Sequence, residues 1–291
     1  MTKVLKIEHL NKSFGKRVIL KNINLQINSG SIVALVGANG AGKTTLINII
    51  LNLIPKNSGE INFTTNNWRQ ITGVMMQDNL SMNRITVKEI INLSRSYFIH
   101  PLPYNQLLHL TGLENHEKRM TNKLSGGQKR RLAFALAVSG DPQILFLDEP
   151  TVGMDSNARH DFWQEVDRLK QSGKTIFVTS HYLEELENIA DRFLILQNSK
   201  IAFDGSIQQL RDLSGECLIE FDSKLQIIDF QNLKSIVSVN LVGHHYQLIT
   251  NDTNNLMEEI VPFFKAIENL QVKQTNLDTL LLSYQEEPQN D

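Results

Sequence analysis

The feature that most constrains the fold is a glycine-rich segment between a buried strand and a helix. Residues 31–37 read SIVALVG, a nearly continuous apolar run that is typical of a strand buried on both faces. The spacing G-x-x-x-x-G-K-[ST] follows from Gly37 to Thr44, and helical spacing continues over Thr44–Ile54. A strand, a glycine turn and a helix in this order predict an α/β fold with a mainly parallel sheet.

The glycine turn holds the residue types that binding of a triphosphate requires. Glycines let consecutive backbone N–H groups point at phosphate oxygens, and the first N–H groups of a helix favour an anion. Lys43 is expected to reach the β- and γ-phosphates, and the Thr44 hydroxyl to bind Mg²⁺. A chance match in a chain of this length has a frequency on the order of one per cent. The predicted nucleotide-binding residues of this turn are Gly37, Ala38, Asn39, Gly40, Ala41, Gly42, Lys43, Thr44 and Thr45.

A second apolar strand, Ile144–Leu147, ends in the paired acids Asp148 and Glu149. Buried strands rarely end in two carboxylates without a cation or a hydrogen-bond partner. At the carboxyl end of a parallel strand, Asp148 is expected beside the glycine turn, where it can hold Mg²⁺. Glu149 is the candidate general base for the water that attacks the γ-phosphate. An ordinary surface acid pair is the alternative, and it is weak beside a phosphate turn.

The string LSGGQ, residues 124–128, opens another helix. Ser125 is a suitable N-cap, and Gly126 and Gly127 leave backbone N–H groups open, so this is a second anion-binding helix start. One triphosphate does not need both helix starts from one subunit. A plain helix cap is the alternative for S-G-G alone.

With these motifs in this order, residues 3–212 resemble the ATP-binding cassette (ABC) family, specifically the ATPase subunits of bacterial transporters. LSGGQ is similar to the family's signature motif. Asp155 in TVGMD matches the family's D-loop aspartate, and Ala38 departs from the proline that the family often has. Three further positions match family residues, namely Gln77 in GVMMQD, His181 in VTSHYLEELE and Phe14 in NKSFGKRVIL.

The resemblance implies a role for each matching residue. Gln77 would contact Mg²⁺ and the attacking water, and His181 would contact the γ-phosphate and orient Glu149. Phe14 would stack on adenine, with a core aromatic as the alternative. The catalytic residues expected are Glu149, His181 and Gln77, and the metal-binding residues expected are Thr44, Gln77 and Asp148.

The family further implies that two ATPase subunits pair head to tail, either as two copies of this chain or with a paralogous subunit. Each ATP would lie between the Gly37–Thr45 turn of one subunit and the Ser125–Gln128 segment of the other. This arrangement adds Ser125, Gly126, Gly127 and Gln128 to the nucleotide-binding residues. Because Glu149 and His181 are both present, active ATP hydrolysis is expected.

Three cations, Lys129, Arg130 and Arg131, follow the signature. They either place positive potential near a partner's γ-phosphate or lie on a solvated helix face, and the second interpretation is preferred for at least two of them.

Composition excludes several classes of protein. Lys and Arg total 29 and Asp and Glu total 31, so a net charge of −2 gives no support to nucleic-acid binding through a broad basic face. The single cysteine, Cys217, excludes an internal disulfide framework. No apolar run reaches the roughly 18 residues of a membrane helix. We therefore expect a chain that is soluble by itself and is held at the cytoplasmic face of the membrane by a separate permease.

The chain is expected to contain two domains. Residues 1–213 would form an ABC ATPase core with an antiparallel β-subdomain at the N-terminus and a helical subdomain at about 80–140, where the family docks its permease. Residues 214–291 would form a small α+β accessory domain. Its expected strands lie at 217–221, 225–230, 236–242 and 246–250, and its expected helices at 256–270 and 277–283. A further helix is expected at 182–189 in the core.

Two features indicate which branch of the family the chain resembles: the spacing between two motifs and the similarity of two short segments. Only 47 positions separate Gln77 from Leu124, which leaves no room for the long coiled coils of DNA-repair relatives. TVGMD and the closing segment QTNLDTLLLSYQEE resemble exporter-type subunits. A soluble ATP-driven regulator or remodelling factor without a permease is the alternative, and an ATP sensor with negligible turnover is a second.

Overall fold

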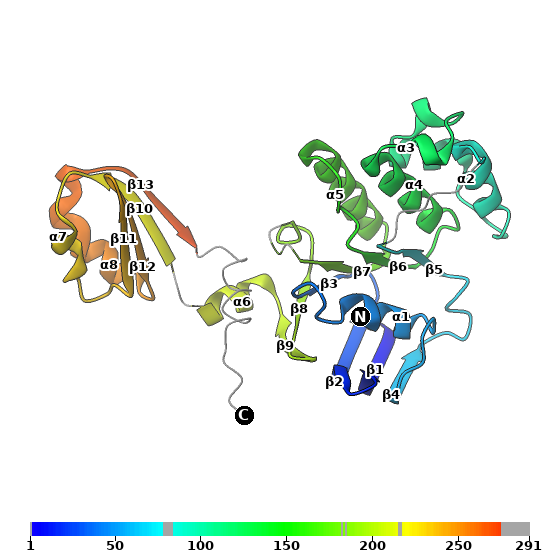
Figure 1. Cartoon of the computed structure of the whole chain (residues 1–291), viewed down its shortest axis with the longest axis horizontal. Helices are drawn as coiled ribbons and strands as arrows, with labels where there is room; N and C mark the ends of the chain where they lie inside the picture. The colour runs from blue at the N-terminus through cyan, green and yellow to red at the C-terminus, as the bar shows by residue number, and fades with distance from the viewer. Residues whose placement is uncertain (1, 78–83, 182, 184, 215–216, 275–291) are drawn as a thin grey trace. The chain divides into compact units, whose positions relative to one another are not determined.

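The computed structural model describes residues 2–77, 84–181, 183, 185–214 and 217–274. Contacts divide the chain into two compact units, residues 1–204 and 205–291, which Figure 1 draws in one view. The boundary predicted at 213/214 lies farther along the chain, and the division into those two domains stays a prediction. Each unit is described by itself.

The core of the first unit is a sheet of six strands in the order β5-β6-β7-β3-β8-β9. Pairing is parallel from β5 through β8, which confirms the mainly parallel sheet. Every residue of β3, β6 and β7 is buried, as expected of strands covered on both faces. The strands are β5 (Thr72–Met75), β6 (Ile144–Asp148), β7 (Thr175–Ser180), β3 (Ile32–Val36), β8 (Arg192–Gln197) and β9 (Lys200–Gly205).

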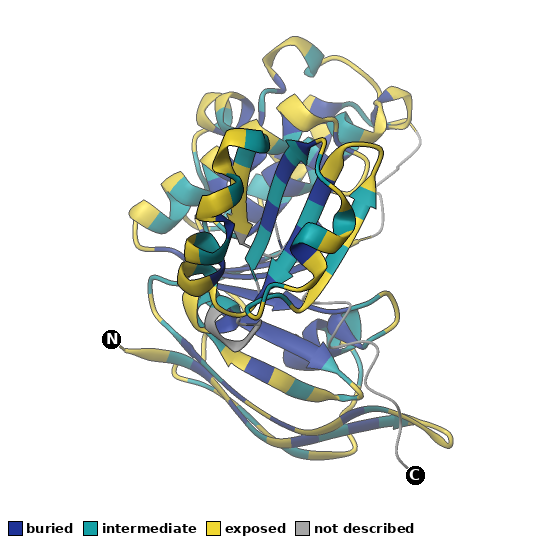
Figure 2. Cartoon of the chain, turned by 90° about the vertical axis from the view of Figure 1, so that its left-hand side faces the viewer, coloured by how far each residue is buried: buried dark blue, intermediate teal, exposed yellow. Residues whose placement is uncertain are grey.

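An antiparallel sheet of three strands precedes this core and confirms the predicted N-terminal β-subdomain. Its order is β2-β1-β4, with β1 at Lys3–Phe14, β2 at Arg17–Asn28 and β4 at Ser58–Phe63. Buried residues alternate with exposed ones along much of β1 and β2, as Figure 2 shows. Strand β1 passes through polar residues near its end with register shifts against β2, and it continues to Phe14.

Five α-helices are described in the first unit: α1 (Lys43–Ile50), α2 (Val87–Arg95), α3 (Tyr104–Thr111), α4 (Gly126–Val138) and α5 (Ser156–Gln171). Helix α4 contacts both α2 and α3, and the three helices form the predicted helical subdomain, together with the 3-10 turns η1 (Glu114–His116) and η2 (Thr121–Lys123) (Figure 1).

Helix α2 begins with a capping box. Thr86 Oγ1 accepts from the Glu89 N–H at 3.2 Å, and the Glu89 carboxylate accepts from the Thr86 N–H at 2.8 Å. The N–H and the hydroxyl of Thr86 both donate to the Glu89 carboxylate, and these two hydrogen bonds hold the pKa of Glu89 below its ordinary value.

The helix expected at 182–189 is wrong for the described residues 185–189, which form turns. The Leu186 and Ile189 N–H groups donate to carbonyls three residues earlier, whereas a regular α-helix would use the fourth. The Glu185 side chain accepts from Thr151 and Arg159 at 2.6 and 2.7 Å, and these contacts fix the segment against its neighbours. Residues 182 and 184 lie outside the described part.

The second unit is an α+β fold with one antiparallel sheet in the order β11-β12-β10-β13. Its chain order is the split β-α-β arrangement β-α-β-β-α-β, preceded by a helix. The elements are α6 (Ile207–Ser214), β10 (Cys217–Ser223), α7 (Ile227–Gln231), β11 (Ser238–Val242), β12 (His245–Thr250), α8 (Thr253–Ile260), the 3-10 helix η3 (Val261–Ala266) and β13 (Ile267–Gln274).

Two predictions for the second unit are wrong. The segment 225–230 was expected as a strand, but helix α7 begins within it at Ile227, where the Gln226 N–H donates to the Asp229 carboxylate at 3.0 Å in a capping interaction. The helix expected at 256–270 ends earlier: a 3-10 segment with Pro262 in its first turn begins at Val261, and the chain from Ile267 pairs as β13. The helix expected at 277–283 lies outside the described residues.

No helix within the described ranges is both long and apolar enough to cross a bilayer.

The identity of α7 gives a test of the second unit. Phe230 is fully buried and Ile228 is 51% exposed, although two residues that are this close would share one face of a strand. We expect Phe230→Ala to cost about 3–5 kcal/mol of local stability and Ile228→Ala less than about 0.5 kcal/mol. Hydrogen exchange of peptides from 217–274 in the full chain measures both. Equal losses for the two variants would contradict the helix.

Candidate nucleotide site

A cavity of about 370 Å³ in the first unit collects residues from four separate stretches of the sequence. It is bounded by the β1–β2 hairpin, the glycine turn with the start of α1, the segment after β5, and the end of β6. Eight of the predicted site residues line it, so residues that are more than a hundred positions apart meet in one place. The lining residues are Arg17, Ile19, Asn39, Gly40, Gly42, Lys43, Thr44, Thr45, Gln77 and Glu149.

The glycine turn is shaped by two close approaches. Gly42 has φ +111°, and a Cβ atom there would stand 2.9 Å from the Ile19 side chain. At Gly37 a Cβ atom would stand 2.6 Å from the Leu196 carbonyl oxygen. Helix α1 starts directly after Gly42 without a side-chain cap. The first N–H groups of α1 therefore meet no capping side chain, which suits a bound phosphate.

Lys43 supplies a buried positive charge at this helix start, with only 6% of the residue exposed. Its Nζ donates to the carbonyl oxygens of Gly37 at 2.6 Å and Ala38 at 3.2 Å. The same Nζ lies 3.2 Å from Glu149 Oε1, so the ammonium and the carboxylate form a buried ion pair. Together with the dipole of α1, Lys43 makes this end of the cavity attractive to phosphate.

Asp148 and Thr44 form an oxygen pair that fits a magnesium ion. Asp148 is fully buried at the end of β6, and Thr44 Oγ1 donates to its Oδ2 at 2.7 Å. Thr179 on β7 donates to the other carboxylate oxygen at 2.5 Å, which fixes the orientation of the group. Hydroxyl and carboxylate oxygens are the ligands that Mg²⁺ prefers. Asp148 does not line the cavity itself, and it reaches the cavity through Thr44.

Glu149 is held on every side. His181 Nδ1 lies 2.7 Å from Glu149 Oε2, and Lys43 approaches the other carboxylate oxygen. The Glu149 N–H donates to Thr179 Oγ1 at 3.0 Å. Its φ of +47° is unusual for a residue other than glycine, so the surrounding contacts must offset the strain. The carboxylate is therefore presented in one fixed position, as a general base requires.

The signature segment lies at the start of α4 and does not line this cavity. Ser125 and Gln128 form a reciprocal capping box, with the Gln128 N–H donating to Ser125 Oγ and the Ser125 N–H donating to Gln128 Oε1. Gly126 and Gly127 follow as the first residues of the helix. The separation from the glycine turn is the arrangement expected if the segment serves a nucleotide on another subunit, which stays a prediction.

Phe14 is placed at the end of β1 and is 52% exposed, so the alternative of a core aromatic does not hold. The buried ammonium of Lys12 lies 4.6 Å from the centre of its ring. Gly37, Ala38 and Ala41 belong to the glycine turn without lining the cavity, and His181 acts on the cavity through Glu149.

Three residues near the cavity were not found from the sequence. Arg17 and Ile19 line it from β2, where nothing but the fold brings them near the glycine turn. Arg130 is 2% exposed, so it is the one of the three cations after the signature that does not lie on a solvated helix face. Its position four residues before the buried Phe134 on α4 was the signal that could have found it.

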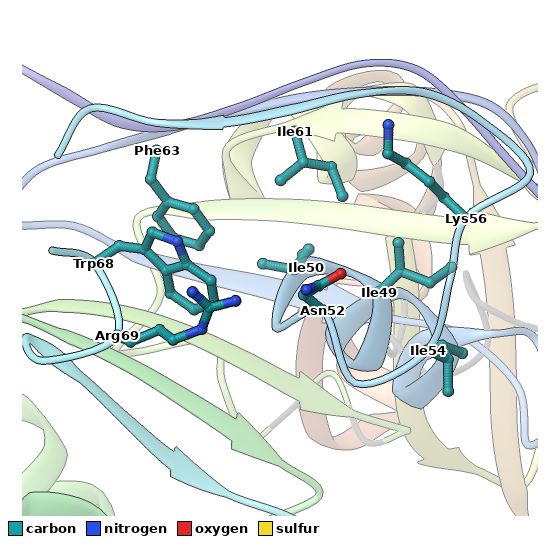
Figure 3. A pocket seen from close by; sticks show the side chains of 9 residues that line it. All are labelled: Ile49, Ile50, Asn52, Ile54, Lys56, Ile61, Phe63, Trp68 and Arg69. Carbon is teal, nitrogen blue, oxygen red and sulfur yellow. The ribbon is translucent and has the colours of Figure 1, made fainter. Parts of the chain in front are cut away.

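A second cavity of about 220 Å³ lies between the end of α1 and β4 (Figure 3). Its aromatic wall is the stacked pair Phe63 and Trp68, with ring centres 4.4 Å apart, and the Arg69 guanidinium lies 4.6 Å from the centre of the Trp68 ring. None of the predicted catalytic or phosphate-binding residues lines this cavity.

Comparison with known proteins bears on the identity of the fold and of the site. Residues 20–152 match the family profile described as ABC transporter. The lantibiotic transport ATP-binding protein SrtF of Streptococcus pyogenes is 36% identical over 70% of this chain and 93% of its own length. The linearmycin resistance ATP-binding protein LnrL of Bacillus subtilis is 29% identical and covers 96% of this chain and 97% of itself. A Nod factor export ATP-binding protein I of Burkholderia lata is 35% identical over 68% of this chain and 69% of its own length.

Solved structures show the same architecture. The ATP-binding cassette MJ0796, described as a dimer in a post-hydrolysis state bound to ADP and Pi, superposes with a TM-score of 0.63 at 25% identity, over 70% of this chain and 98% of that one. An ATP-binding subunit of an ABC transporter superposes with a TM-score of 0.66 at 24% identity, over 73% of this chain and 93% of that one. The glycine turn, the buried acid pair and the extent of these matches agree, and this chain belongs to the ABC transporter family of ATP-binding proteins.

Proposed function

We propose that this chain is the ATP-hydrolysing subunit of an exporter-type ABC transporter, which drives a separate membrane permease. The observation that carries the proposal is the position of Glu149 at the lysine end of the cavity, with its two carboxylate oxygens held by Lys43 and His181. The names of the similar proteins, lantibiotic transport, linearmycin resistance and Nod factor export, favour export.

The residues of the cavity divide the work of hydrolysis. Lys43 and the first N–H groups of α1 bind the phosphates, and Phe14 stacks on the base. Thr44, Asp148 and Gln77 would hold Mg²⁺, which would supply positive charge to the phosphate groups when it is bound. A water oxygen attacks the γ-phosphorus while the bond to the β,γ-bridging oxygen breaks. Glu149 takes the water proton, His181 keeps the carboxylate oriented, and the products are ADP and phosphate.

Pairing of two ATPase subunits completes the site. The signature residues Ser125–Gln128 lie outside the cavity of their own chain, so a second copy or a paralogous subunit is proposed to bring its signature to this cavity. The similarity to a cassette described as dimeric supports this proposal. ATP between the two surfaces would hold them together, and hydrolysis would release them.

The permease is proposed to contact the helical subdomain, which places the chain at the cytoplasmic face of the membrane. Three apolar side chains near the end of α2 are strongly exposed: Leu93 at 48%, Tyr97 at 78% and Ile99 at 88%. Apolar side chains gathered at one exposed place are typical of protein contact surfaces. A soluble regulator without a permease remains the competing function, and membrane association distinguishes the two.

We expect Glu149→Gln to reduce the turnover of ATP by about 10²–10⁴-fold, because an amide cannot take the water proton. Binding of ATP should survive, so size exclusion with light scattering should show an ATP-dependent dimer. Glu165→Gln is the matched control, because Glu165 lies on α5 and does not line the cavity. This variant should hydrolyse ATP at the wild-type rate. Unchanged turnover in Glu149→Gln would refute the general-base assignment.

Lys43→Ala should weaken ATP binding by about 10- to 100-fold, because a charge-assisted hydrogen bond to phosphate is lost. Titration with a fluorescent ATP analogue measures the Kd. Lys56→Ala changes a lysine that lines the second cavity and should leave the Kd unchanged. An equal effect of both substitutions would place the nucleotide elsewhere.

The transport assignment predicts that the chain sediments with membranes only when its permease partner, a separate membrane protein, is also produced. Ile99→Glu should lower the sedimented fraction severalfold, because a charge would be buried at the contact, while the ATPase rate of the isolated subunit stays unchanged. A chain that never leaves the supernatant would favour the soluble regulator.

A further inference from the structure

Arg130 is a buried cation inside the first unit that the mechanism above does not use. It lies on the second turn of α4, five residues after the N-cap Ser125, and is 2% exposed. Burial of a guanidinium is costly unless its N–H groups find acceptors. The acceptors of Arg130 therefore indicate what the residue does.

Three backbone carbonyl oxygens from two separate segments accept from Arg130. Nη1 donates to Met76 at 3.0 Å, Nη2 donates to Glu149 at 3.0 Å, and Nε donates to Val152 at 3.3 Å. Met76 precedes Gln77, and Val152 lies in the segment that leads from Glu149 to α5. The planar fork of arginine can serve several acceptors at once, which a lysine ammonium on a single nitrogen cannot reproduce.

The contact with Glu149 falls on a strained residue. The left-handed conformation of Glu149, with φ +47°, fixes the direction of its carbonyl group. The N–H of Glu149 is held by Thr179, and its carbonyl is held by Arg130. Both backbone polar groups of the candidate general base are therefore fixed by side chains, one from β7 and one from α4.

The contact with Met76 affects Gln77, the other residue that is proposed to contact the attacking water. Gln77 lines the cavity and is itself exposed, so its own side chain has no tight packing to hold it. The Met76 carbonyl belongs to the peptide group that joins Met76 to Gln77. A hydrogen bond to this carbonyl therefore fixes the position of the Gln77 backbone.

We propose that Arg130 is a positioning residue for hydrolysis, which sets the backbone of Gln77 and Glu149 relative to each other from the signature helix α4. The effect on hydrolysis rests on the proposed function. The link that one guanidinium makes between the two segments and α4 rests only on the three hydrogen bonds. A displacement on the scale of 1 Å at a reacting group can cost on the order of 100-fold in rate.

The test compares Arg130→Gln and Arg130→Lys with the same substitutions at Arg131. Arg131 is the next residue on α4, is partly exposed, and lies 3.7 Å from Asp161 on α5. We expect kcat to fall by about 10- to 100-fold in Arg130→Gln, with the Kd for Mg-ATP within about threefold of the wild type. Arg130→Lys should stay at least about fivefold below the wild type, because one nitrogen replaces three donors. Both Arg131 variants should keep the wild-type kcat.

A second measurement does not depend on hydrolysis. Without nucleotide, hydrogen exchange at Gln77 and at residues 151–152 should be faster in the Arg130 variants and unchanged in the Arg131 variants. If Arg130→Gln does not fold, Arg130→Lys decides both measurements. Wild-type kcat and wild-type exchange in Arg130→Lys would overturn the inference. A loss of activity that comes entirely from a raised Kd for Mg-ATP, with kcat unchanged, would also overturn it. If the wild-type chain does not hydrolyse ATP, the proposed function fails, while the exchange rates still decide whether Arg130 positions the two segments.

Discussion

The burial of two adjacent carboxylates at the end of β6 is the constraint on which the site depends. Asp148 is fully buried and Glu149 is 5% exposed, and a carboxylate in such a place must be paired or hydrogen-bonded. The required partners come from α1 and from β7 with the residue that follows it. Strand β6 must therefore lie next to β7 and opposite the start of α1, and this requirement also creates the cavity.

Much of this could be predicted from the sequence because the signals are local. The buried strands are short apolar runs, and the glycine turn with its lysine has one physical use in this context. The residues that contact the two acids from distant parts of the sequence were harder to predict. Thr179 carries no role in the motifs identified from the sequence, and Arg17 and Ile19 reach the cavity through the pairing of β1 with β2.

The wrong predictions share a physical cause, since packing decided where local preference was ambiguous. Segment 225–230 has apolar residues that fit either a strand or one helical turn, and burial of Phe230 against Phe221 and Tyr246 accompanies the helix. The chain after Pro262 has helical spacing, but pairing with β10 makes its last part a strand. Arg130 was not singled out among the three cations, although its helical position lies on the buried stripe with Phe134 and Val138.

Helix α4 joins two features that were described separately. Its first residues belong to the signature, which the proposed pair of subunits presents to a nucleotide on the neighbouring chain, and one turn later its Arg130 holds the Glu149 carbonyl of its own chain. A small tilt of α4 would then change the geometry of both nucleotide sites of the pair. Thermodynamic linkage makes such an influence on binding reciprocal, so occupancy of either site would change the affinity of the other for its nucleotide.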